Sequence, residues 1–390
     1  MRYLKHDMTV TFFSNFLNHH QTPFCDEMYK LLTGNFNFVA TERVPDERLN
    51  LGYKDYSHSF PYNINSYESK ILKDKALTLA NESDVIIIGS APDVFIKERL
   101  RNNKVTFRYY ERFFKKGTIR LLDPRVLINN LLTHTLFRSK NLHLLCASAF
   151  TSFDATLLHA YPNKRWKWGY FPEVHEYDIE KLMSSKPVEK LNILWVGRFL
   201  NWKHPKHAIK IARRLKDKNY LFFLNLIGTG DELEETKKKV KKYGLEEFVS
   251  FLGPMNHEEV RSYMEKANIF LFTSDKQEGW GVVLNEAMNS GCAIIASDAI
   301  GSVPFLINDQ INGLVYKSGN VNELFNKVES LMINFNLRNS LGRNAYDTIV
   351  TRWSPKIAAD RFIRLSKSIL EGKEIQFEDG PCSIAQVIRG

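Results

Sequence analysis

The sequence predicts an α/β protein that contains two doubly wound parallel sheets. Short apolar runs rich in β-branched and aromatic residues alternate with segments of helical periodicity, as expected when helices connect parallel strands. This alternation restarts near Leu191, after a polar stretch that contains Pro187. At 390 residues the chain is long enough for two domains of ordinary size, each with its own core.

The first half of the chain supplies five strand-like runs. They are Thr9 to Phe13, Phe36 to Ala40, Val85 to Gly89, Val105 to Tyr109 and Leu142 to Ala147. A helical segment, Cys25 to Leu32, follows the first run, and a long loop is expected at 45–67, where Tyr, Asn and Ser are frequent. We expect this half to end near Pro172.

Polar residues follow two of these strands, where an open α/β sheet binds its ligands. The loop after the first strand contains Asn18, His19, His20 and Gln21, and Glu111 follows the fourth strand. Adjacent histidines point apart in regular structure and no third ligand is evident, so we predict no metal site. We expect these five residues to bind an acceptor substrate.

The second half repeats the alternation with a second set of strands. They are Leu191 to Val196, Leu221 to Ile227, Val249 to Leu252, Ile269 to Phe272 and Ala293 to Ala296. Ser354 is a suitable N-cap and Pro355 a suitable first residue for a last helix. The expected division is a first domain over 1–183, a linker at 184–190, a second domain over 191–350, a helix at 351–371 and a loose tail at 372–390.

The stretch from Asn268 to Ser297 is the most informative about function. A buried strand ends in polar residues and is followed by the sequence Glu278-Gly279-Trp280-Gly281 and a helical segment, 282–289. Two glycines let the backbone approach a ligand closely, and the first amides of the helix lack partners inside it, so a phosphate can bind there. Glu278 and Glu286 can converge on the hydroxyls of a sugar or a ribose.

This stretch resembles the retaining glycosyltransferases of family 4, which have the GT-B fold. Their E-x7-E signature corresponds to Glu278 and Glu286, and the resemblance is strong over about 191–331. It implies two Rossmann-like domains that face each other across a cleft, with a C-terminal helix that crosses back to the first domain. It also implies transfer from a nucleotide-diphosphate sugar with retention of configuration, without a cofactor or a metal ion.

The resemblance assigns roles to individual residues. Arg198 and Lys203 would bind the donor diphosphate, and two cations there stabilise the departing charge more in the transition state than in the ground state. Glu278 would position the sugar hydroxyls and Glu286 the ribose. The other expected donor-binding residues are Gly228, Gly230, Gly253, Pro254, Met255, Gly279, Trp280, Gly281, Val282 and Val283.

The sequence also departs from the family pattern. Ser302 and Phe305 replace the Gly and Glu of the family's Gly-Gly-x-Pro-Glu segment. Many relatives have a histidine in the first domain near the reacting sugar; none stands at the corresponding place here, and Glu111 is the nearest titratable residue.

The formal net charge of +10 indicates an anionic partner. From Arg99 to Arg120 eight basic residues accompany one acid, Glu111, and Phe113 and Phe114 lie among them. Residues 99–122 could contact an anionic membrane, or they could form a solvated face above core phenylalanines. No apolar run reaches about 18 residues and the N-terminus lacks a signal-peptide core, so we expect a cytoplasmic protein, peripheral at the inner face of the cell membrane.

The function predicted from the sequence is hexosyl transfer to a hydroxyl of a lipid-linked or saccharide acceptor, in polysaccharide or glycolipid synthesis. Two alternatives stay open. One is a nucleotide-sugar-binding or nucleic-acid-binding module without catalysis, although no nucleic-acid partner is expected. The other is a dinucleotide-dependent oxidoreductase, suggested by Gly228-Thr229-Gly230, although Leu233 stands where its third glycine would be.

Overall fold

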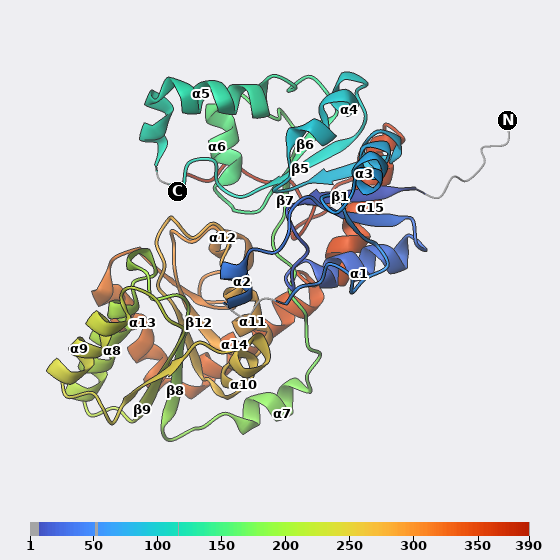
Figure 1. Cartoon of the computed structure of the whole chain (residues 1–390). Helices are drawn as coiled ribbons and strands as arrows, with labels where there is room; N and C mark the ends of the chain where they lie inside the picture. Colours follow the sequence, from blue (N-terminus) through green and yellow to red (C-terminus); the bar gives the residue numbers. More distant parts are fainter. Residues whose placement is uncertain (1–7, 51–53, 116, 390) are drawn as a thin grey trace. The chain divides into compact units, whose positions relative to one another are not determined.

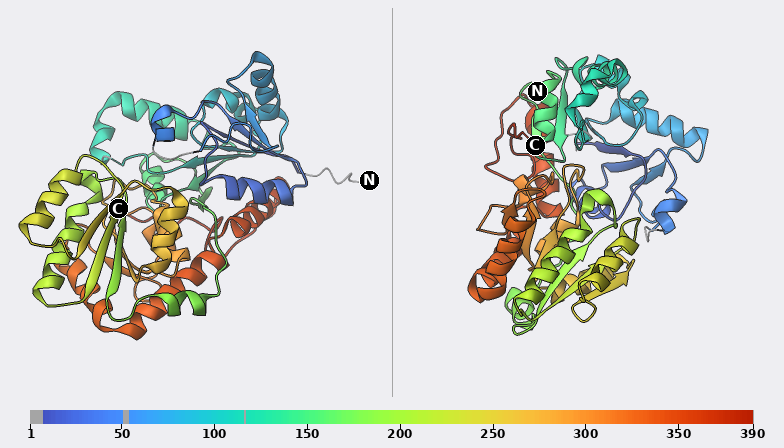
Figure 2. Two further views of the ribbon diagram at one scale, coloured as in Figure 1. Left: turned by 60° about the horizontal axis from the view of Figure 1, so that its bottom comes forward. Right: turned by 90° about the vertical axis from the view of Figure 1, so that its left-hand side faces the viewer.

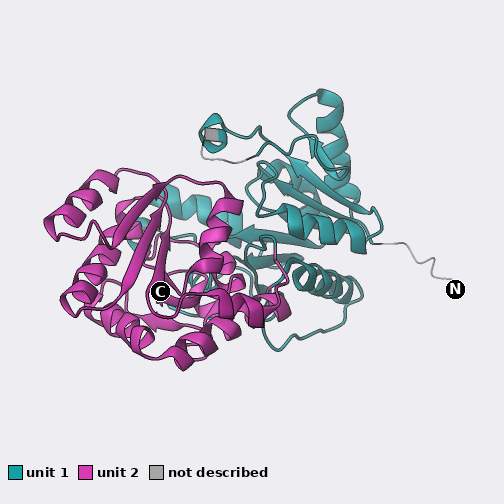
Figure 3. Cartoon of the chain, turned by 90° about the horizontal axis from the view of Figure 1, so that it is seen from below, with its two compact units in different colours: residues 1–173, 354–389 teal, residues 174–353, 390 magenta. Residues whose placement is uncertain are grey.

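The computed structural model describes residues 8–50, 54–115 and 117–389. The chain forms two compact units. Unit 1 contains the described residues up to Glu173 together with Ser354–Arg389, and unit 2 contains Val174–Trp353 (Figure 3). The chain therefore leaves unit 1 once and returns to it.

Unit 1 is built on a parallel sheet in the order β3-β2-β1-β4-β5-β6-β7. Its strands are β1 (Val10–Ser14), β2 (Phe36–Ala40), β3 (Asn63–Asn65), β4 (Val85–Ile88), β5 (Thr106–Tyr110), β6 (Leu142–Cys146) and β7 (Arg165–Lys167). Its helices are α1 (Thr22–Leu31), α2 (Asp46–Asn50), α3 (Lys70–Glu82), α4 (Lys97–Arg101), α5 (Pro124–Asn130), α6 (Thr151–Leu157) and α15 (Pro355–Leu370), with the short turns η1 (Asp93–Phe95), η2 (Thr118–Leu122) and η3 (Leu131–Thr135). Figure 1 shows these elements in sequence colours.

Unit 2 repeats the same relative strand order, β10-β9-β8-β11-β12-β13, again all parallel. Its strands are β8 (Leu191–Val196), β9 (Phe222–Ile227), β10 (Val249–Gly253), β11 (Ile269–Phe272), β12 (Ala293–Ser297) and β13 (Leu314–Tyr316). Its helices are α7 (Ile179–Ser185), α8 (Pro205–Asp217), α9 (Leu233–Lys242), α10 (His257–Lys266), α11 (Val283–Asn289), α12 (Val303–Leu306), α13 (Val321–Ile333) and α14 (Phe335–Thr351), with the turn η4 (Asn201–Lys203). Helices cover both faces of this sheet (Figure 2).

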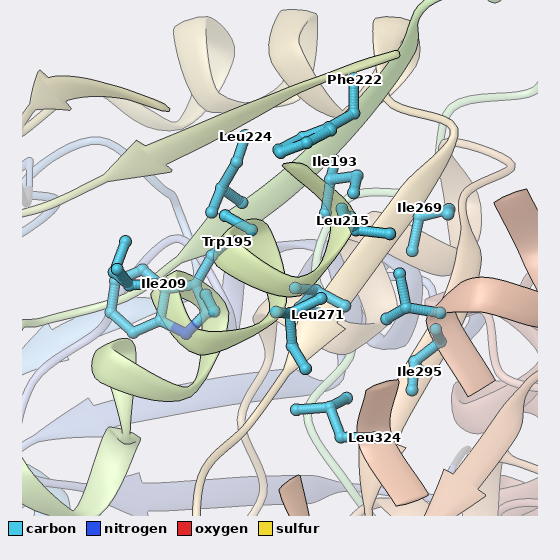
Figure 4. Close-up of a cluster of buried hydrophobic side chains, with 14 of the residues drawn as sticks. Ile193, Trp195, Ile209, Leu215, Phe222, Leu224, Ile269, Leu271, Ile295 and Leu324 are labelled. Atoms are coloured by element: carbon cyan, nitrogen blue, oxygen red, sulfur yellow. The ribbon is translucent and has the colours of Figure 1, made fainter. Parts of the chain in front are cut away.

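The core of unit 2 follows from its apolar strands and from helix α8. Pro205 occupies the start of α8, and Ala208, Ile209 and Leu215 turn one stripe of the helix into the core. Trp195 of β8 lies in the same cluster (Figure 4). The prediction of two doubly wound parallel sheets is confirmed.

Helix α15 belongs to unit 1, as the sequence indicated. Ser354 caps it by accepting a hydrogen bond from the amide of Ile357 at 3.4 Å. The helix packs on α1, and the ring of Phe362 lies 6.4 Å from Phe24, 4.9 Å from Phe107 and 5.7 Å from Trp168. The final helix thus completes the core of the first unit.

The ten predicted strands are all present, each to within a residue or two at its ends, but three short edge strands were not predicted. β3 and β7 extend the sheet of unit 1, and β13 extends the sheet of unit 2. Each is three residues long, too short for a strand signal in the sequence. The segment expected to be a long loop, 45–67, contains α2 and β3, and its residues 51–53 lie outside the described ones.

The C-terminal segment is packed, which differs from the loose tail that we expected. Cys382 is fully buried, and Lys167 forms an ion pair with Asp379 at 2.6 Å. The hydroxyl of Ser152 donates to the carbonyl of Ala385 at 3.0 Å. At the other boundary, α7 occupies the start of the expected linker, and the compact units divide between Glu173 and Val174.

The basic run that begins at Arg99 is not a continuous surface, so the prediction of a basic face over 99–122 is wrong for three of its arginines. Arg99 is buried and donates to the carbonyls of Ser83, Asp84 and Val105, the acceptors that a buried guanidinium needs. Arg108 pairs with Asp93 at 2.9 Å and Arg112 with Asp154 at 3.2 Å. Phe114 is buried, and Lys116 lies outside the described residues.

Within the described residues, no helix combines the length and the apolar character that a membrane span requires. All four cysteines, Cys25, Cys146, Cys292 and Cys382, are buried free thiols.

Candidate active site

The polar side chains of unit 2 meet at the carboxyl ends of β8 and β11. These strands are neighbours at the point where the strand order reverses, and ligands bind there in open α/β sheets. Lys203 follows β8 and Glu278 follows β11, and the two form an ion pair. Their side chains are 13% and 10% exposed, so each charge depends on the other for its stability in the free protein.

Hydroxyl groups hold this ion pair in place. Ser274 donates to Oε2 of Glu278 at 3.0 Å. Thr273 donates to the carbonyl of Lys203 at 2.7 Å and accepts from the indole N–H of Trp195 at 2.9 Å. The loop after β8 is thereby fastened to the end of β11, which fixes the position of the ammonium group relative to the carboxylate.

The Gly-x-Gly turn after β9 supports the same loop. Gly228 has a φ of +129°, and a Cβ there would lie 2.0 Å from the carbonyl oxygen of Gly197. The amide of Phe199 donates to the carbonyl of Thr229 at 2.8 Å. The glycines are therefore required for close packing of two loops, and binding of a donor phosphate by Gly228 and Gly230 stays a prediction.

Arg198 differs from Lys203 in its surroundings. It is exposed, and within the residues that the structure describes no ion pair holds its guanidinium. It lies in the β8 loop that Thr229 and Thr273 fasten, so its backbone is fixed while its side chain can reorient. The segment Gly253-Pro254-Met255 follows β10, and the carbonyl of Gly253 accepts from the amide of Gly228 at 2.8 Å.

Trp280 is a core residue in the structure, although we predicted it to bind the donor. It is 1% exposed and its indole N–H donates to Asn285 at 2.9 Å. Its ring lies 5.9 Å from Trp353, and Phe305 stacks on Trp353. The side chain therefore cannot contact a donor in this conformation, which leaves its backbone as the only part that could.

The two departures from the family segment fit this packing. The hydroxyl of Ser302 donates to the carbonyl of Trp280 at 2.6 Å. Phe305 occupies the apolar cluster with Trp280 and Trp353. Both residues thus stabilise the position of the loop that carries Glu278.

Helix α11 begins at Val283, one residue later than predicted. The amides of Gly281, Val282 and Val283 donate to no protein acceptor within the described part of the chain. Gly281 has a φ of +79°, and a Cβ there would lie 2.3 Å from Phe272. Glu286 lies in the first turn of the helix, where burial raises its pKa to about 6 although the charge of Arg261 lowers it.

Unit 1 has its own polar cavity, again at the strand-order reversal of its sheet. The cavity measures about 490 Å³, within the range of small-ligand sites. Residues at or after the carboxyl ends of β1, β4 and β5 line it, together with Arg48 of α2 and Tyr170 from a later loop. They are Ser14, Asn15, Phe16, Asn18, His20, Gln21, Arg48, Gly89, Ser90, Tyr109, Tyr110, Glu111, Arg112, Lys115 and Tyr170.

Glu111 is the centre of a hydrogen-bonded group in this cavity. Its carboxylate accepts from the hydroxyl of Tyr170 at 2.8 Å and pairs with Lys115. The hydroxyl of Thr151 donates to its carbonyl at 2.9 Å. Burial raises the pKa of Tyr170, as does the nearby carboxylate, so this phenol remains a hydrogen-bond donor at neutral pH.

A buried ion pair anchors the loop that follows Glu111. Asp154 accepts from the guanidinium of Arg112 and from the amides of Phe113 at 3.0 Å and Phe114 at 3.4 Å. A carboxylate with several donors stabilises a fixed loop conformation. The backbone around Glu111 is therefore rigid.

The structure places four of the five predicted acceptor residues in this cavity. Asn18, His20, Gln21 and Glu111 line the cavity, whereas His19 is not among the lining residues and its ring lies 3.8 Å from that of His20. Tyr109, Lys115 and Tyr170 were not predicted. Tyr109 lies at the end of β5 and Lys115 follows that strand, and these positions could have indicated both, but Tyr170 comes from a distant loop that carries no such signal.

Comparison with known proteins agrees with this geometry. The family described as Glycosyl transferases group 1 matches residues 178–348. The match spans less than half of the chain. The match covers almost the whole of unit 2, including Lys203 and Glu278.

Two curated relatives align with about the same region. An uncharacterised glycosyltransferase of Methanocaldococcus jannaschii is 28% identical over 192 residues, 49% of this chain and 48% of the relative. The amylovoran biosynthesis glycosyltransferase AmsK of Erwinia amylovora is 32% identical over 141 residues, 35% of this chain and 34% of the relative. The chain therefore spans about half or less of the length of these relatives.

A solved structure resembles the chain over nearly its full length. The Anabaena protein HepE, in complex with UDP, has a TM-score of 0.66 at 16% identity, covering 94% of this chain and 99% of HepE. At this identity the likeness shows the fold alone. Together with the two parallel sheets, it shows that the chain has the GT-B fold.

Proposed function

We propose that the protein transfers a sugar from a nucleotide-diphosphate sugar to a hydroxyl acceptor, with retention of configuration, in polysaccharide or glycolipid synthesis. The observation that carries the proposal is the buried pair of Lys203 and Glu278 inside the region that matches the family. A cation for a diphosphate and a carboxylate for sugar hydroxyls stand side by side at the ligand-binding edge of the sheet.

In this mechanism Lys203 and Glu278 bind different parts of the donor. Lys203 and Arg198 bind the diphosphate and stabilise the negative charge that grows on it as the glycosidic bond breaks. Glu278, released from Lys203, accepts hydrogen bonds from the sugar hydroxyls, while Ser274 keeps its carboxylate oriented. Glu286 accepts from the ribose.

No protein nucleophile is required by this proposal. The leaving phosphate deprotonates the acceptor hydroxyl on the same face of the sugar, so configuration is retained. The amides of Gly281, Val282 and Val283 add donors for the phosphate, because no protein acceptor uses them within the described residues.

The acceptor binds in the cavity of unit 1. Its lining offers hydroxyls, amides and the Glu111 carboxylate, which suits a polyhydroxylated substrate. Its cations, Arg48 and Lys115, suit an acceptor that carries a phosphate, such as a lipid-linked saccharide. Glu111 would orient the acceptor hydroxyl in place of the histidine found in many relatives.

A donor screen tests the proposal. The protein is incubated with UDP-, GDP- and ADP-sugars, and release of free nucleotide is measured with and without saccharide acceptors. We expect release with one class of donor. Tight binding without release would favour a binding module, and reduction of a dinucleotide would favour an oxidoreductase.

The Glu278→Ala variant tests the assigned role. We expect turnover to fall by at least about a thousandfold, as for loss of a group that acts on the reacting centre, with nucleotide affinity nearly unchanged. Full activity in this variant would contradict the proposed role of Glu278. Glu265→Ala, a carboxylate on α10 that bonds Tyr177, is the control.

A further inference from the structure

The exposed apolar side chains of unit 1 concentrate on one segment, residues 118–136, which we call the apolar ridge. Single exposed apolar residues are common on proteins, but a contiguous set marks an interaction surface. Leu122 is 80% and Ile119 is 73% exposed. The exposed large apolar residues of the ridge are Ile119, Leu122, Ile128, Leu131, Leu132 and Leu136.

The ridge is a regular, anchored structure. It consists of η2, α5 and η3, which follow one another directly, and α5 is drawn at the margin of unit 1 (Figure 1). Asp123 caps α5 by accepting from the amide of Arg125 at 2.9 Å. The apolar side chains are thus displayed on helical turns.

One side of the ridge is fixed to the body of unit 1. His134 is buried, stacks on Phe113 at 4.1 Å and hydrogen-bonds to the hydroxyl of Tyr161 at 2.8 Å. Thr135 donates to the carbonyl of Leu158 at 2.7 Å. His134 and Thr135 thus face the body of unit 1, and the six apolar side chains named above remain exposed.

Positive charge accompanies the aliphatic side chains. Arg120, Arg125 and Arg138 are exposed on or directly after the ridge, whereas its one carboxylate, Asp123, is used by the helix cap. A cavity of about 470 Å³ beside the end of η3 adds Arg165 and His159 to Arg138, and no acidic residue lines it.

The types of residue on the ridge indicate whether a protein or a lipid bilayer binds there. Protein interfaces favour aromatic side chains and exclude charge from their centre. Here the exposed large apolar residues are all leucine or isoleucine, and Arg120 and Arg125 stand between them in the sequence. Aliphatic side chains with interspersed cations suit the boundary between acyl chains and anionic headgroups.

We propose that the apolar ridge inserts into the headgroup region of an anionic lipid bilayer. Its leucine and isoleucine side chains lie among the upper acyl chains, and Arg120, Arg125 and Arg138 bind lipid phosphates. This surface shares only 118–122 with the one expected at 99–122, in which Arg99, Arg108 and Arg112 are internal. The inference concerns binding alone, so it can hold or fail independently of the proposed transfer reaction.

A site-specific probe tests insertion directly. Leu122→Cys and Ile71→Cys are labelled with an environment-sensitive fluorophore; both native side chains are 80% exposed, and the four native cysteines are buried. With vesicles of phosphatidylglycerol and phosphatidylcholine, we expect a blue shift at position 122 and none at position 71 on α3. Equal behaviour of the two probes would overturn the proposal.

Co-sedimentation with the same vesicles measures how much the arginines and the apolar side chains each contribute to binding. Each cation near the surface contributes about fivefold in affinity, so Arg120→Gln/Arg125→Gln/Arg138→Gln should reduce binding about a hundredfold. Leu122→Ser/Leu132→Ser should reduce it at least about tenfold, and Ile71→Ser should not change it. Binding that is equally strong to pure phosphatidylcholine would contradict the role of the arginines.

Size-exclusion chromatography tests whether a second copy of this chain, and not a membrane, covers the apolar ridge. A wild-type dimer that becomes monomeric in Leu122→Ser/Leu132→Ser, without vesicle binding, would refute the membrane proposal. If the wild type and this variant are both monomers and only the variant fails to bind vesicles, the membrane proposal is supported.

Discussion

The two units share one backbone plan and use it differently. Each sheet reverses its strand order at its centre, between β1 and β4 in unit 1 and between β8 and β11 in unit 2. Each unit brings its polar side chains to the carboxyl ends of those strands. The backbone thus fixes where a ligand can bind, and the side chains fix which ligand.

The side chains at the two positions differ in kind. Unit 2 has a buried pair of full charges, Lys203 and Glu278, held by Thr273 and Ser274. Unit 1 has a cavity of about 490 Å³ with phenols and amides around Glu111. Under the proposed function, the charged donor and the polyhydroxylated acceptor use different sites on the same backbone plan, and variants in each unit should separate the two tasks.

Removing the cation of unit 2 should have the largest effect. In Lys203→Met we expect kcat/KM to fall about a thousandfold, since the diphosphate loses a preorganised cation. The free energy of unfolding should also fall by about 3 kcal/mol, because Glu278 is left buried without its partner. Steady-state kinetics and chemical denaturation measure the two effects.

The double variant Lys203→Met/Glu278→Gln separates stability from catalysis. It should regain most of the lost stability and none of the activity. Lys206→Met, which breaks a more exposed pair with Glu232 elsewhere in unit 2, serves as the control and should keep most of the activity. Equal activity losses in Lys203→Met and Lys206→Met would argue against a specific role for Lys203.

Two threonines provide a matched comparison between the units. Thr273 donates to the carbonyl of Lys203, and Thr151 donates to the carbonyl of Glu111. Thr273→Val also leaves the indole N–H of Trp195 without its acceptor, so stability should fall by about 2 kcal/mol. We expect donor turnover to fall about tenfold in Thr273→Val and to stay unchanged in Thr151→Val. The reverse result would indicate that unit 1, and not unit 2, binds the donor.

Changes in the unit 1 cavity should act on the acceptor alone. Tyr170→Phe removes the hydrogen bond to Glu111, and Glu111→Gln removes the charge that Lys115 balances. We expect the acceptor KM to rise about tenfold, corresponding to loss of about one well-placed hydrogen bond. Donor hydrolysis without acceptor should be unchanged, so a parallel loss of hydrolysis would contradict the assignment of unit 1 to the acceptor.

The smallest expected effect is a pH-dependent gain in stability from Glu286→Gln. The pKa of Glu286 is raised to about 6, so between its unfolded pKa and 6 the folded chain binds more protons than the unfolded chain. Wild-type stability therefore decreases as pH rises through that window. At pH 7.5 the variant should be more stable by about 1 kcal/mol, and at pH 4 the two proteins should be equal.

Thermal denaturation at the two pH values measures this gain. The variant should also bind donor less tightly, because a carboxylate accepts from the ribose more strongly than an amide. A variant with unchanged donor affinity would remove the proposed contact with the ribose.

The central parts of the fold could be predicted from the sequence. Buried parallel strands such as β4 and β11 are continuous apolar runs, and their alternation with helices is visible without tertiary information. The edge strand β7 could not be predicted, because its three residues are only partly buried and it depends on pairing with β6.

Side-chain environments were less predictable than strands. Lys203 and Glu278 could be placed from their positions after strands. Trp280, by contrast, was assigned to the donor because the sequence does not reveal its partner Trp353, which lies far along the chain. Arg99 was counted as a surface charge for the same reason, since its acceptors are carbonyls of separate segments.

The return of the chain to unit 1 has a consequence for biosynthesis. The ribosome must complete all of unit 2 before it releases Phe362 and the rest of α15, which cover Phe24, Phe107 and Trp168. The continuous second unit can therefore acquire its native structure during translation, while the first waits with an uncovered apolar face. A nascent chain that stalls near Trp353 would present this face to chaperones.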